Sequence, residues 1–513
     1  MADGNGNGRV PGVEARAGKF PGPSLIPPLT AIQREHGWLP REELVKLSRD
    51  WRRPLYEIEG IVSFYPHFRT SPAEPLEVAV CRDLSCWLAR DRAEIPDGAT
   101  VHEVSCVGRC DQAPIAIVEE RYPAVQRGEG RRPNDPYTSA DEHYGVFRSF
   151  GGDPVPVLDD SGLKGMGGAG FPTGKKWAMV RGQEDPIKYV VCNADEAEPG
   201  TFKDRQILAE QAHLVIEGML IAMRTIGSQQ AWVFIRHEYE PEEEVVREEI
   251  ERARASGLLD DVSIDVFTSP GGYILGEETA LLECMEGHRG EPRNKPPFPG
   301  GYGLHGRPTL MNNVETFASI PIILERGAEW WKDQGVNGGA GLKFFSVSGH
   351  VEQPGVFCVP AGTLVSEVIE LAGGVRDGAA VGAVQPGGAS TNFLGPDCVD
   401  LPLTFDAVAE AGSALGTGAM VVVAEGTDLL AAATNVLNFF RTESCGKCVP
   451  CRVGSNKAQK ILVEVLERGG GGSDVDERID ELEETLRLTS ICGLGQVALG
   501  PVMSVLRMQR ERV

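Results

Sequence analysis

Two groups of cysteines constrain the fold of this chain more than any other feature of its sequence. Eight of the twelve cysteines fall into these groups, one near each end of the 513 residues. In a large acidic chain whose N-terminus lacks a cationic, apolar signal segment, clustered cysteines more often bind metal or carry redox chemistry than form disulfides. The fold therefore has to bring four thiolates to one point at two places.

The C-terminal group has the pattern C-x2-C-x2-C followed by one distant cysteine. Its members are Cys445, Cys448, Cys451 and Cys492. Three close thiolates can bind one face of a [4Fe–4S] cluster while the fourth arrives from another helix end, so this spacing favours that cluster. A zinc ion bound by four cysteines is the alternative. Residues 429–440, 457–468 and 475–488 have helical apolar periodicity, which predicts a small helical bundle.

The N-terminal group consists of two pairs, and each pair follows a strand-like segment. Its members are Cys81, Cys86, Cys106 and Cys110. Two loops at neighbouring strand ends can bring four thiolates together, which suits a [2Fe–2S] cluster or a zinc ion. The spacings C-x4-C and C-x3-C are wider than the knuckles typical of zinc and favour the [2Fe–2S] cluster. Zinc and unligated thiols are the alternatives.

A glycine-rich stretch lies between the two groups. Residues 161–177 contain six glycines together with Lys164, Lys175 and Lys176. Glycine lets backbone N–H groups come close to a ligand, and the lysines add charge for an anionic one. The spacing of Gly165, Gly167 and Gly170 fits G-x-G-x-x-G, but the segment before it is a poor strand, so a plain surface loop is the alternative.

Polar residues follow a short buried-type strand at 188–191. Asn193, Asp195, Glu196 and Glu198 come directly after it. Strand–helix–strand alternation over 231–267 implies an α/β sheet, and ligands of such sheets bind where the strands end. The sequence therefore predicts a binding site at this edge.

Four stretches of the chain, together with the C-terminal cysteines, resemble a known family. The stretches are 161–177, 188–200, 271–278 and 294–316. They are similar to the flavin subunit of respiratory complex I, the NADH-binding 51-kDa type, and to its relatives in NAD-linked hydrogenases and formate dehydrogenases, from about Ser161 to the C-terminus. Residues 60–65 (GIVSFY) and 106–114 (CVGRCDQAP), with the first cysteine pair, resemble the thioredoxin-like [2Fe–2S] subunit of the 24-kDa type. The chain thus looks like a fusion of two subunits.

The resemblance implies an α/β multidomain protein with six parts. They are a flexible tail over 1–28, a thioredoxin-like [2Fe–2S] domain over 29–122, a linker over 123–150, an α/β domain for FMN and NAD over 151–335, an SLBB-like β-grasp domain over 336–425, and a helical [4Fe–4S] domain over 426–513.

The resemblance also implies the cofactors FMN, NAD(H), [2Fe–2S] and [4Fe–4S], with site residues at matching positions. The residues matched to FMN are Gly165, Gly167, Lys176, Asn193, Asp195, Glu196, Gly276, Glu277, Glu278, Asn312, Asn313 and Thr316. Those matched to NAD are Gly168, Phe171, Glu198, Lys295 and Phe298. No side chain is expected to act as a general base, because hydride passes between nicotinamide and flavin and the protein positions the two rings. Two residues depart from the family: Met166 stands where arginine is usual, and Met179 where an aromatic residue is common.

Net charge and hydropathy argue against two classes of function, nucleic-acid binding and membrane spanning. The net charge of −24 argues against nucleic-acid binding, and no apolar run is long enough to span a bilayer. We expect a cytoplasmic diaphorase subunit, most consistent with the beta subunit of an NAD-dependent formate dehydrogenase. Its partner would be a molybdopterin-type alpha subunit with further iron–sulfur clusters. The alternatives are a diaphorase of an NAD-reducing hydrogenase, a fused complex I subunit, and a non-catalytic electron-transfer or scaffold protein without flavin.

Overall fold

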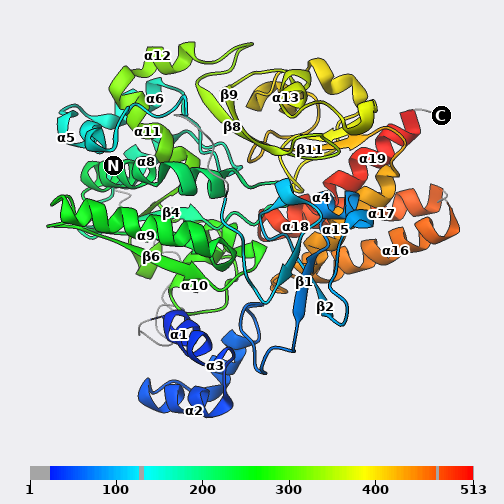
Figure 1. Cartoon of the computed structure of the whole chain (residues 1–513), viewed down its shortest axis with the longest axis horizontal. Coiled ribbons are helices and arrows are strands. Elements are labelled where there is room, and N and C mark those ends of the chain that lie inside the picture. The colour runs from blue at the N-terminus through cyan, green and yellow to red at the C-terminus, as the bar shows by residue number, and fades with distance from the viewer. Residues whose placement is uncertain (1–23, 126–131, 470–472, 512–513) are drawn as a thin grey trace, which may run out of the picture.

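The computed structural model describes residues 24–125, 132–469 and 473–511 (Figure 1). Most of the predicted N-terminal tail lies outside these ranges. Within these ranges the chain forms three separate sheets with their helices and a C-terminal helical bundle. None of the helices within the described ranges combines the length and apolarity needed to cross a lipid bilayer.

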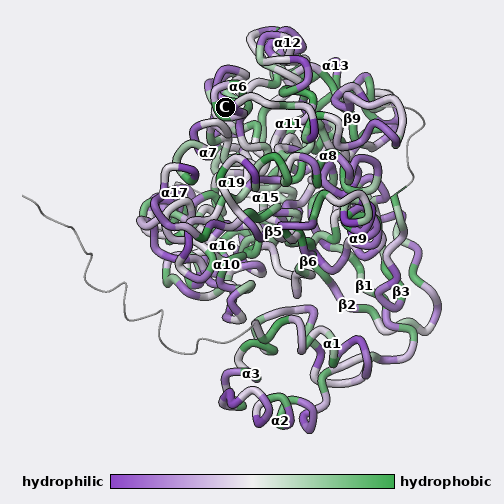
Figure 2. The backbone as a smooth tube through the Cα atoms, turned by 90° about the vertical axis from the view of Figure 1, so that its left-hand side faces the viewer, coloured by the Kyte–Doolittle hydropathy of each residue, from purple (hydrophilic) through white to green (hydrophobic). Residues whose placement is uncertain are grey.

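The N-terminal part divides into a helical lobe and a small sheet. The lobe consists of α1 (Ile26–His36), α2 (Arg41–Asp50) and α3 (Leu55–Val62), and it lies below the body in both overall views (Figures 1 and 2). The sheet has the order β2-β1-β3, with β1 (Glu77–Cys81), β2 (Thr100–Val104) and β3 (Ala116–Val118). Strand β1 pairs parallel with β2 and antiparallel with β3, and α4 (Leu84–Leu88) follows β1.

A four-stranded parallel sheet with the order β6-β5-β4-β7 forms the central α/β domain. Its strands are β4 (Tyr189–Ala194), β5 (Gln230–Arg236), β6 (Ser263–Ser269) and β7 (Thr309–Asn313). The helices of this domain are α6 (Pro154–Asp160), α7 (Thr173–Arg181), α8 (Lys203–Ile226), α9 (Glu240–Ala255), α10 (Glu278–Met285), α11 (Val314–Arg326) and α12 (Ala328–Asp333). The predicted strand–helix–strand unit at 231–267 is therefore present. The segment before the glycine stretch, a poor strand by sequence, is helix α6.

Alternate residues of the central strands enter two different cores. Val190 and Cys192 of β4 pack with α8, α9 and α11, whereas Val191 between them packs toward α10 and the N-terminal lobe. Side chains of a strand point alternately to its two faces, so a run of apolar residues serves both cores. Because both faces of β4 are buried, the position of the sheet edge where β4 and β7 end is fixed.

The described part of the predicted linker is packed against the α/β domain. Asn134 exchanges hydrogen bonds with Gln211, where α8 is kinked, and the Tyr137 hydroxyl donates to the Glu217 carboxylate at 2.7 Å. Helix α5 (Gly145–Ser149) lies beyond them. Polar composition predicted a linker between the two family segments; two of its aromatic side chains, Tyr137 and Tyr144, are buried in the core of the α/β domain.

The remaining two parts follow the β-grasp and helical expectations. The β-grasp sheet has the order β10-β11-β8-β9, with β8 (Leu342–Gly349), β9 (Gly355–Pro360), β10 (Val381–Gln385) and β11 (Ala419–Ala424). Its helices are α13 (Val365–Leu371) and α14 (Phe405–Glu410). The C-terminal bundle contains α15 (Leu429–Thr442), α16 (Ser455–Arg468), α17 (Ser473–Thr489), α18 (Gly493–Val497) and α19 (Gly500–Glu511).

Candidate functional site

The first cysteine group meets at the ends of β1 and β2. All four sulfur-bearing side chains are buried in one small cluster with Phe202, the residue directly before α8. The Sγ atoms of Cys106 and Cys110 are 3.5 Å apart. The Gly108 N–H donates to Cys106 Sγ and the Gly200 N–H to Cys110 Sγ, both at 3.4 Å. Four thiols at one point, with backbone donors to sulfur, fit the ligand set of a [2Fe–2S] cluster.

The second group gathers in the C-terminal bundle. Cys445 and Cys448 follow α15, Cys451 lies in a single π-helical turn (Pro450–Gly454), and Cys492 caps α18. The Cys451 thiol interacts with those of Cys448 and Cys445, and the Cys492 thiol with that of Cys445. Ser444 Oγ lies 3.2 Å from Cys451 Sγ. The distant cysteine therefore joins the other three as the spacing predicts.

The glycine stretch forms a closed loop in front of α7. The loop closes through the bond from the Gly165 N–H to the Phe171 carbonyl, at 2.8 Å. A side chain at Gly167 would begin 3.2 Å from Asn313 Cβ, and one at Gly170 would begin 3.0 Å from the Phe405 ring. The loop is thus pressed between the sheet edge and the β-grasp domain, and a Cβ at either position would be tighter than ordinary van der Waals contact; at Gly170 a φ of +62° also favours glycine.

The sheet edge brings most of the predicted flavin residues together. In the register of β4 and β7, Asn193 lies beside Asn313. Asn193 Nδ2 donates to the Gly276 carbonyl at 3.0 Å, and Lys176 Nζ donates to the Met311 carbonyl at 3.1 Å. Asn312 accepts from the indole of Trp177 at 3.0 Å, and Thr316 accepts from the Met166 N–H at 2.9 Å.

Two buried carboxylates of the acidic loop have different surroundings. Burial raises the pKa of Asp195 to about 7, and its Oδ2 has no hydrogen-bond partner among the described residues. Glu196 is already engaged: its carboxylate accepts from the N–H groups of Asp204 and Arg205 and from the Tyr239 hydroxyl. An orphaned buried acceptor at Asp195 fits a ligand with ring N–H or hydroxyl donors, as a flavin has, whereas the Glu196 side chain serves the start of α8.

Four of the five residues matched to NAD are at least partly exposed around this edge, and Glu198 is buried. Phe171 and Phe298 are 43% and 59% exposed, and Gly168 lies in the glycine loop. Lys295 Nζ is 2.8 Å from Glu277 Oε1 and 3.2 Å from Glu278 Oε1. Glu198 is buried, and its Oε2 accepts from the Tyr273 hydroxyl at 2.6 Å. The site therefore has accessible aromatic rings beside a charge cluster.

The two departures from the family pattern lie in different environments. The Met166 side chain is buried in the core of the α/β domain, whereas Met179 is 57% exposed on α7. Met166 thus fills apolar space and does not lie on the open side of the loop, where arginine could meet phosphates.

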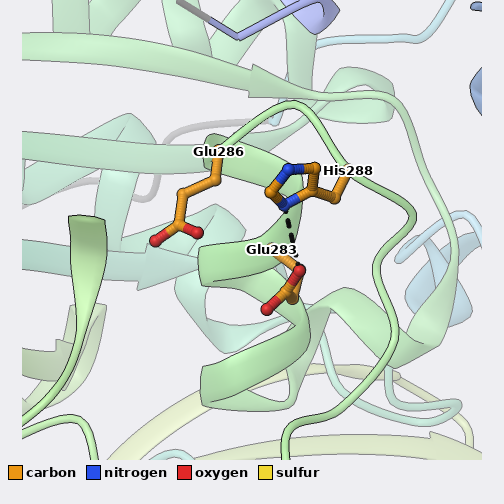
Figure 3. A group of neighbouring side chains, drawn as sticks. All are labelled: Glu283, Glu286 and His288. Carbon is orange, nitrogen blue, oxygen red and sulfur yellow. Dashed lines mark hydrogen bonds and ion pairs between the residues drawn. The ribbon is translucent and has the colours of Figure 1, made fainter. Parts of the chain in front are cut away.

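A polar cluster that the sequence did not indicate lies at the end of α10. Figure 3 shows Glu283, Glu286 and His288 gathered there, with His288 Nδ1 3.1 Å from Glu283 Oε2. The Arg293 guanidinium pairs with Glu283 at 2.6 Å and Glu286 at 2.8 Å. Because the guanidinium pairs with both carboxylates, the cluster anchors the loop that continues to Lys295. No local sequence signal marks such a network.

Glu443 connects three parts of the chain next to the second cysteine group. Its carboxylate accepts from the Ser105 hydroxyl, beside Cys106, and from the Tyr273 N–H at 2.8 Å. Arg236, at the end of β5, donates to the carbonyls of Cys106 and Glu196. The two cysteine groups and the sheet edge are therefore tied together by buried hydrogen bonds.

Four family models match the chain. They are the Nuo51 FMN-binding domain at residues 158–322, the NADH-ubiquinone oxidoreductase-F iron-sulfur binding region at 431–513, the thioredoxin-like [2Fe-2S] ferredoxin at 19–97 and the SLBB domain at 344–393. These matches confirm the predicted fold class, the fusion and the cofactors FMN, NAD(H), [2Fe–2S] and [4Fe–4S].

Relatives and solved structures agree with the family models. The F subunit of NADH-quinone oxidoreductase from Escherichia coli (strain K12) is 40% identical over 392 residues, covering 74% of this chain and 88% of the relative. The NADP-reducing hydrogenase subunit HndC of Solidesulfovibrio fructosivorans is 39% identical, covering 72% and 78%. A crystal structure of an NAD+-reducing [NiFe]-hydrogenase in the H2-reduced state superposes with a TM-score of 0.84 at 31% identity, covering 94% of this chain and 92% of that one. The chain belongs to the family of the NADH-quinone oxidoreductase F subunits, with a thioredoxin-like [2Fe–2S] domain fused ahead of the flavin domain.

Proposed function

We propose that this chain is the diaphorase subunit of a multisubunit oxidoreductase, in which electrons pass between NAD(H) and a partner chain. The observation that carries the proposal is the meeting of the glycine loop, the acidic loop and the Glu277–Lys295 pair at one sheet edge, with both cysteine groups tied to that edge. A site built only to support iron–sulfur clusters would not need the orphaned Asp195 oxygen or the exposed aromatic rings.

The residues of the chain divide the work of binding and orientation. FMN held at this site would supply hydride exchange with NAD(H) and single-electron exchange with iron–sulfur clusters. The amides of the glycine loop and Lys176 would hold the flavin phosphate and ring edges, and Asp195 would accept a hydrogen bond from the ring. Phe171 and Phe298 would stack on the adenine or nicotinamide. Glu198 would orient the nicotinamide through its amide or ribose.

Formate is the substrate that we assign to the partner chain. The support is the fused arrangement, which resembles the beta subunits of NAD-dependent formate dehydrogenases. The partner would then be a molybdopterin-type alpha subunit. Hydrogen is the second candidate, and the likeness to the NAD+-reducing [NiFe]-hydrogenase over 94% of the chain favours it.

One anaerobic experiment tests the diaphorase assignment. The purified protein is mixed with NADH while its visible absorbance is followed, and a parallel sample is frozen for EPR. We expect bleaching of flavin absorbance and signals of reduced clusters. Iron without flavin, and no response to NADH, would favour the non-catalytic electron-transfer protein. Metal analysis of the complex isolated from its native host separates the partners: molybdenum supports formate, and nickel supports hydrogen.

A further inference from the structure

The segment that follows the acidic loop is held along its whole length by the β-grasp domain. Five consecutive residues, Glu198–Phe202, each have a β-grasp contact. The contacts are Ser390 N–H to Glu198 Oε1, Ala389 N–H to the Pro199 carbonyl at 3.2 Å, Val421 against Gly200, Thr417 Oγ1 to Thr201 Oγ1 at 2.7 Å, and Ser346 Oγ to the Phe202 N–H at 3.0 Å. This domain therefore does more than cover the outside of the flavin domain.

The other side of the same segment faces the first cysteine group. The Gly200 N–H donates to Cys110 Sγ at 3.4 Å, and the Phe202 ring packs among the four cysteines. The segment thus runs from Glu198 to the cysteine group with the β-grasp sheet behind it. A shift of the β-grasp domain would move both ends of this connection.

The Glu198 carboxylate receives one donor from each of two domains. The Tyr273 hydroxyl reaches Oε2 at 2.6 Å from the flavin domain, and the Ser390 N–H reaches Oε1 from the β-grasp domain. Glu198 is only 8% exposed. Since each oxygen has its own donor, the plane of the carboxylate is set by the two domains together.

The β-grasp loop at residues 385–391 is built to hold this position. The buried Gln385 amide donates to the Thr391 carbonyl at 2.8 Å, and the Thr391 hydroxyl donates to the Gly388 carbonyl at 2.9 Å. Gly388 has φ +94°, and a Cβ there would lie 2.6 Å from Glu198 Cγ. Any larger residue at this position would displace the Glu198 side chain.

We propose that this β-grasp loop sets the orientation of Glu198 in the nicotinamide site, with Gly388, Ser390 and Thr391 as positioning residues. The inference rests on the proposed function, in which Glu198 contacts the nicotinamide nucleotide. It gives the β-grasp domain a role in nucleotide binding.

The test compares two glycine-to-alanine variants of the full chain in its native complex. Gly388→Ala displaces Glu198, whereas Gly374→Ala has φ +86° in the same domain and nothing within 4 Å of the added Cβ. Binding of NAD+ to the oxidised protein, followed by flavin absorption, needs no turnover. Loss of one hydrogen bond to a charged group, about 1.5 kcal/mol, predicts a roughly tenfold weaker NAD+ affinity for Gly388→Ala. Gly374→Ala should bind as the wild type does.

The Glu198→Ala background separates an effect on the orientation of Glu198 from general backbone strain at residue 388. In Glu198→Ala, adding Gly388→Ala should weaken NAD+ binding no further, because the displaced carboxylate is gone. Equal effects of Gly388→Ala and Gly374→Ala, or the same loss with and without the Glu198 carboxylate, would overturn the inference. If Gly388→Ala does not fold, Thr391→Val should weaken NAD+ binding and Thr391→Ser should restore the binding. Thr391→Val and Thr391→Ser variants that bind NAD+ alike would also overturn the inference. Failure of the wild type to bleach with NADH would instead refute the proposed function.

Discussion

Four buried charges join the flavin domain to the β-grasp domain. Lys343 on β8 donates to Glu315 on α11 at 2.7 Å, and Lys203 at the start of α8 is 2.9 Å from the same carboxylate. Lys203 also pairs with Asp204 at 2.6 Å and reaches Asn313 Oδ1 at 3.3 Å. Two cations and two anions balance inside the protein, next to a residue matched to the flavin.

Replacing Lys343 by methionine keeps the side-chain length and leaves one uncompensated negative charge. Breaking a buried ion pair from one side costs about 3–5 kcal/mol. Glu315 would still have Lys203 and the Phe344 N–H, at 3.0 Å, so the lower end of that range applies. A loss of about 3 kcal/mol predicts a fall in the thermal midpoint of about 6–12 °C for a cooperative folding unit of about 150–250 residues.

The assay follows flavin release and the loss of helical signal during heating of wild type and variants at one scan rate. Lys332→Met is the matched control, because Lys332 pairs with Glu329 at the surface and should leave the midpoint unchanged. The double variant Lys343→Met/Glu315→Gln should recover at least half of the loss, since the orphaned charge is removed. A midpoint for Lys343→Met equal to that of Lys332→Met, or a double variant less stable than the single one, would refute the reasoning.

Three further predictions concern separate parts of the chain. Cys106→Ser should abolish the EPR signal of the [2Fe–2S] cluster and leave the flavin content unchanged, which absorbance and EPR on one sample decide. Phe298→Ala should raise the KM for NADH about tenfold if the ring stacks on the nucleotide, while Tyr56→Ala, on α3, should not change KM in the same dye-reduction assay. Burial raises the pKa of Glu217 to about 7. The folded chain therefore holds a proton on Glu217 that the unfolded chain releases near pH 4.5. The stability that this proton contributes is complete below about pH 4.5 and is lost as pH rises through about 7. Glu217→Gln should therefore show a smaller fall in thermal midpoint between about pH 5 and pH 7 than the wild type does, and parallel curves would contradict the pKa shift.

Local patterns in the sequence predicted the elements of the fold well. The strands around Val190, Val233 and Ile264 have runs of apolar residues, and α9 has the acidic start and basic end that a helix dipole favours. Cysteine spacing predicted both metal-binding groups because their ligands lie close to element ends. The strand and helix signals are each contained within one element, and the cysteine signals within short spacings plus, at the C-terminus, one distant residue.

The same reasoning could not find the contacts that complete the site. Ser390 is 192 residues from Glu198, and Glu443 is 338 residues from Ser105. Such pairs depend on how whole domains pack, which no spacing records. The role of Glu196 at the start of α8 and the burial of Met166 were missed for a related reason: composition gives the chemistry of a side chain but not the direction in which it points.

The N-terminal domain is joined to the rest of the molecule by apolar packing and polar contacts in addition to the peptide chain. Arg205 pairs with Asp111 at 2.8 Å, and Tyr65 donates to the His288 carbonyl. When two binding partners are on one chain, association becomes intramolecular, with an effective concentration in about the millimolar range. The covalent link then keeps the [2Fe–2S] domain in place even when the protein is extremely dilute. The fusion also fixes the two redox domains at equal copy number, so no flavin domain is made without its accompanying cluster domain.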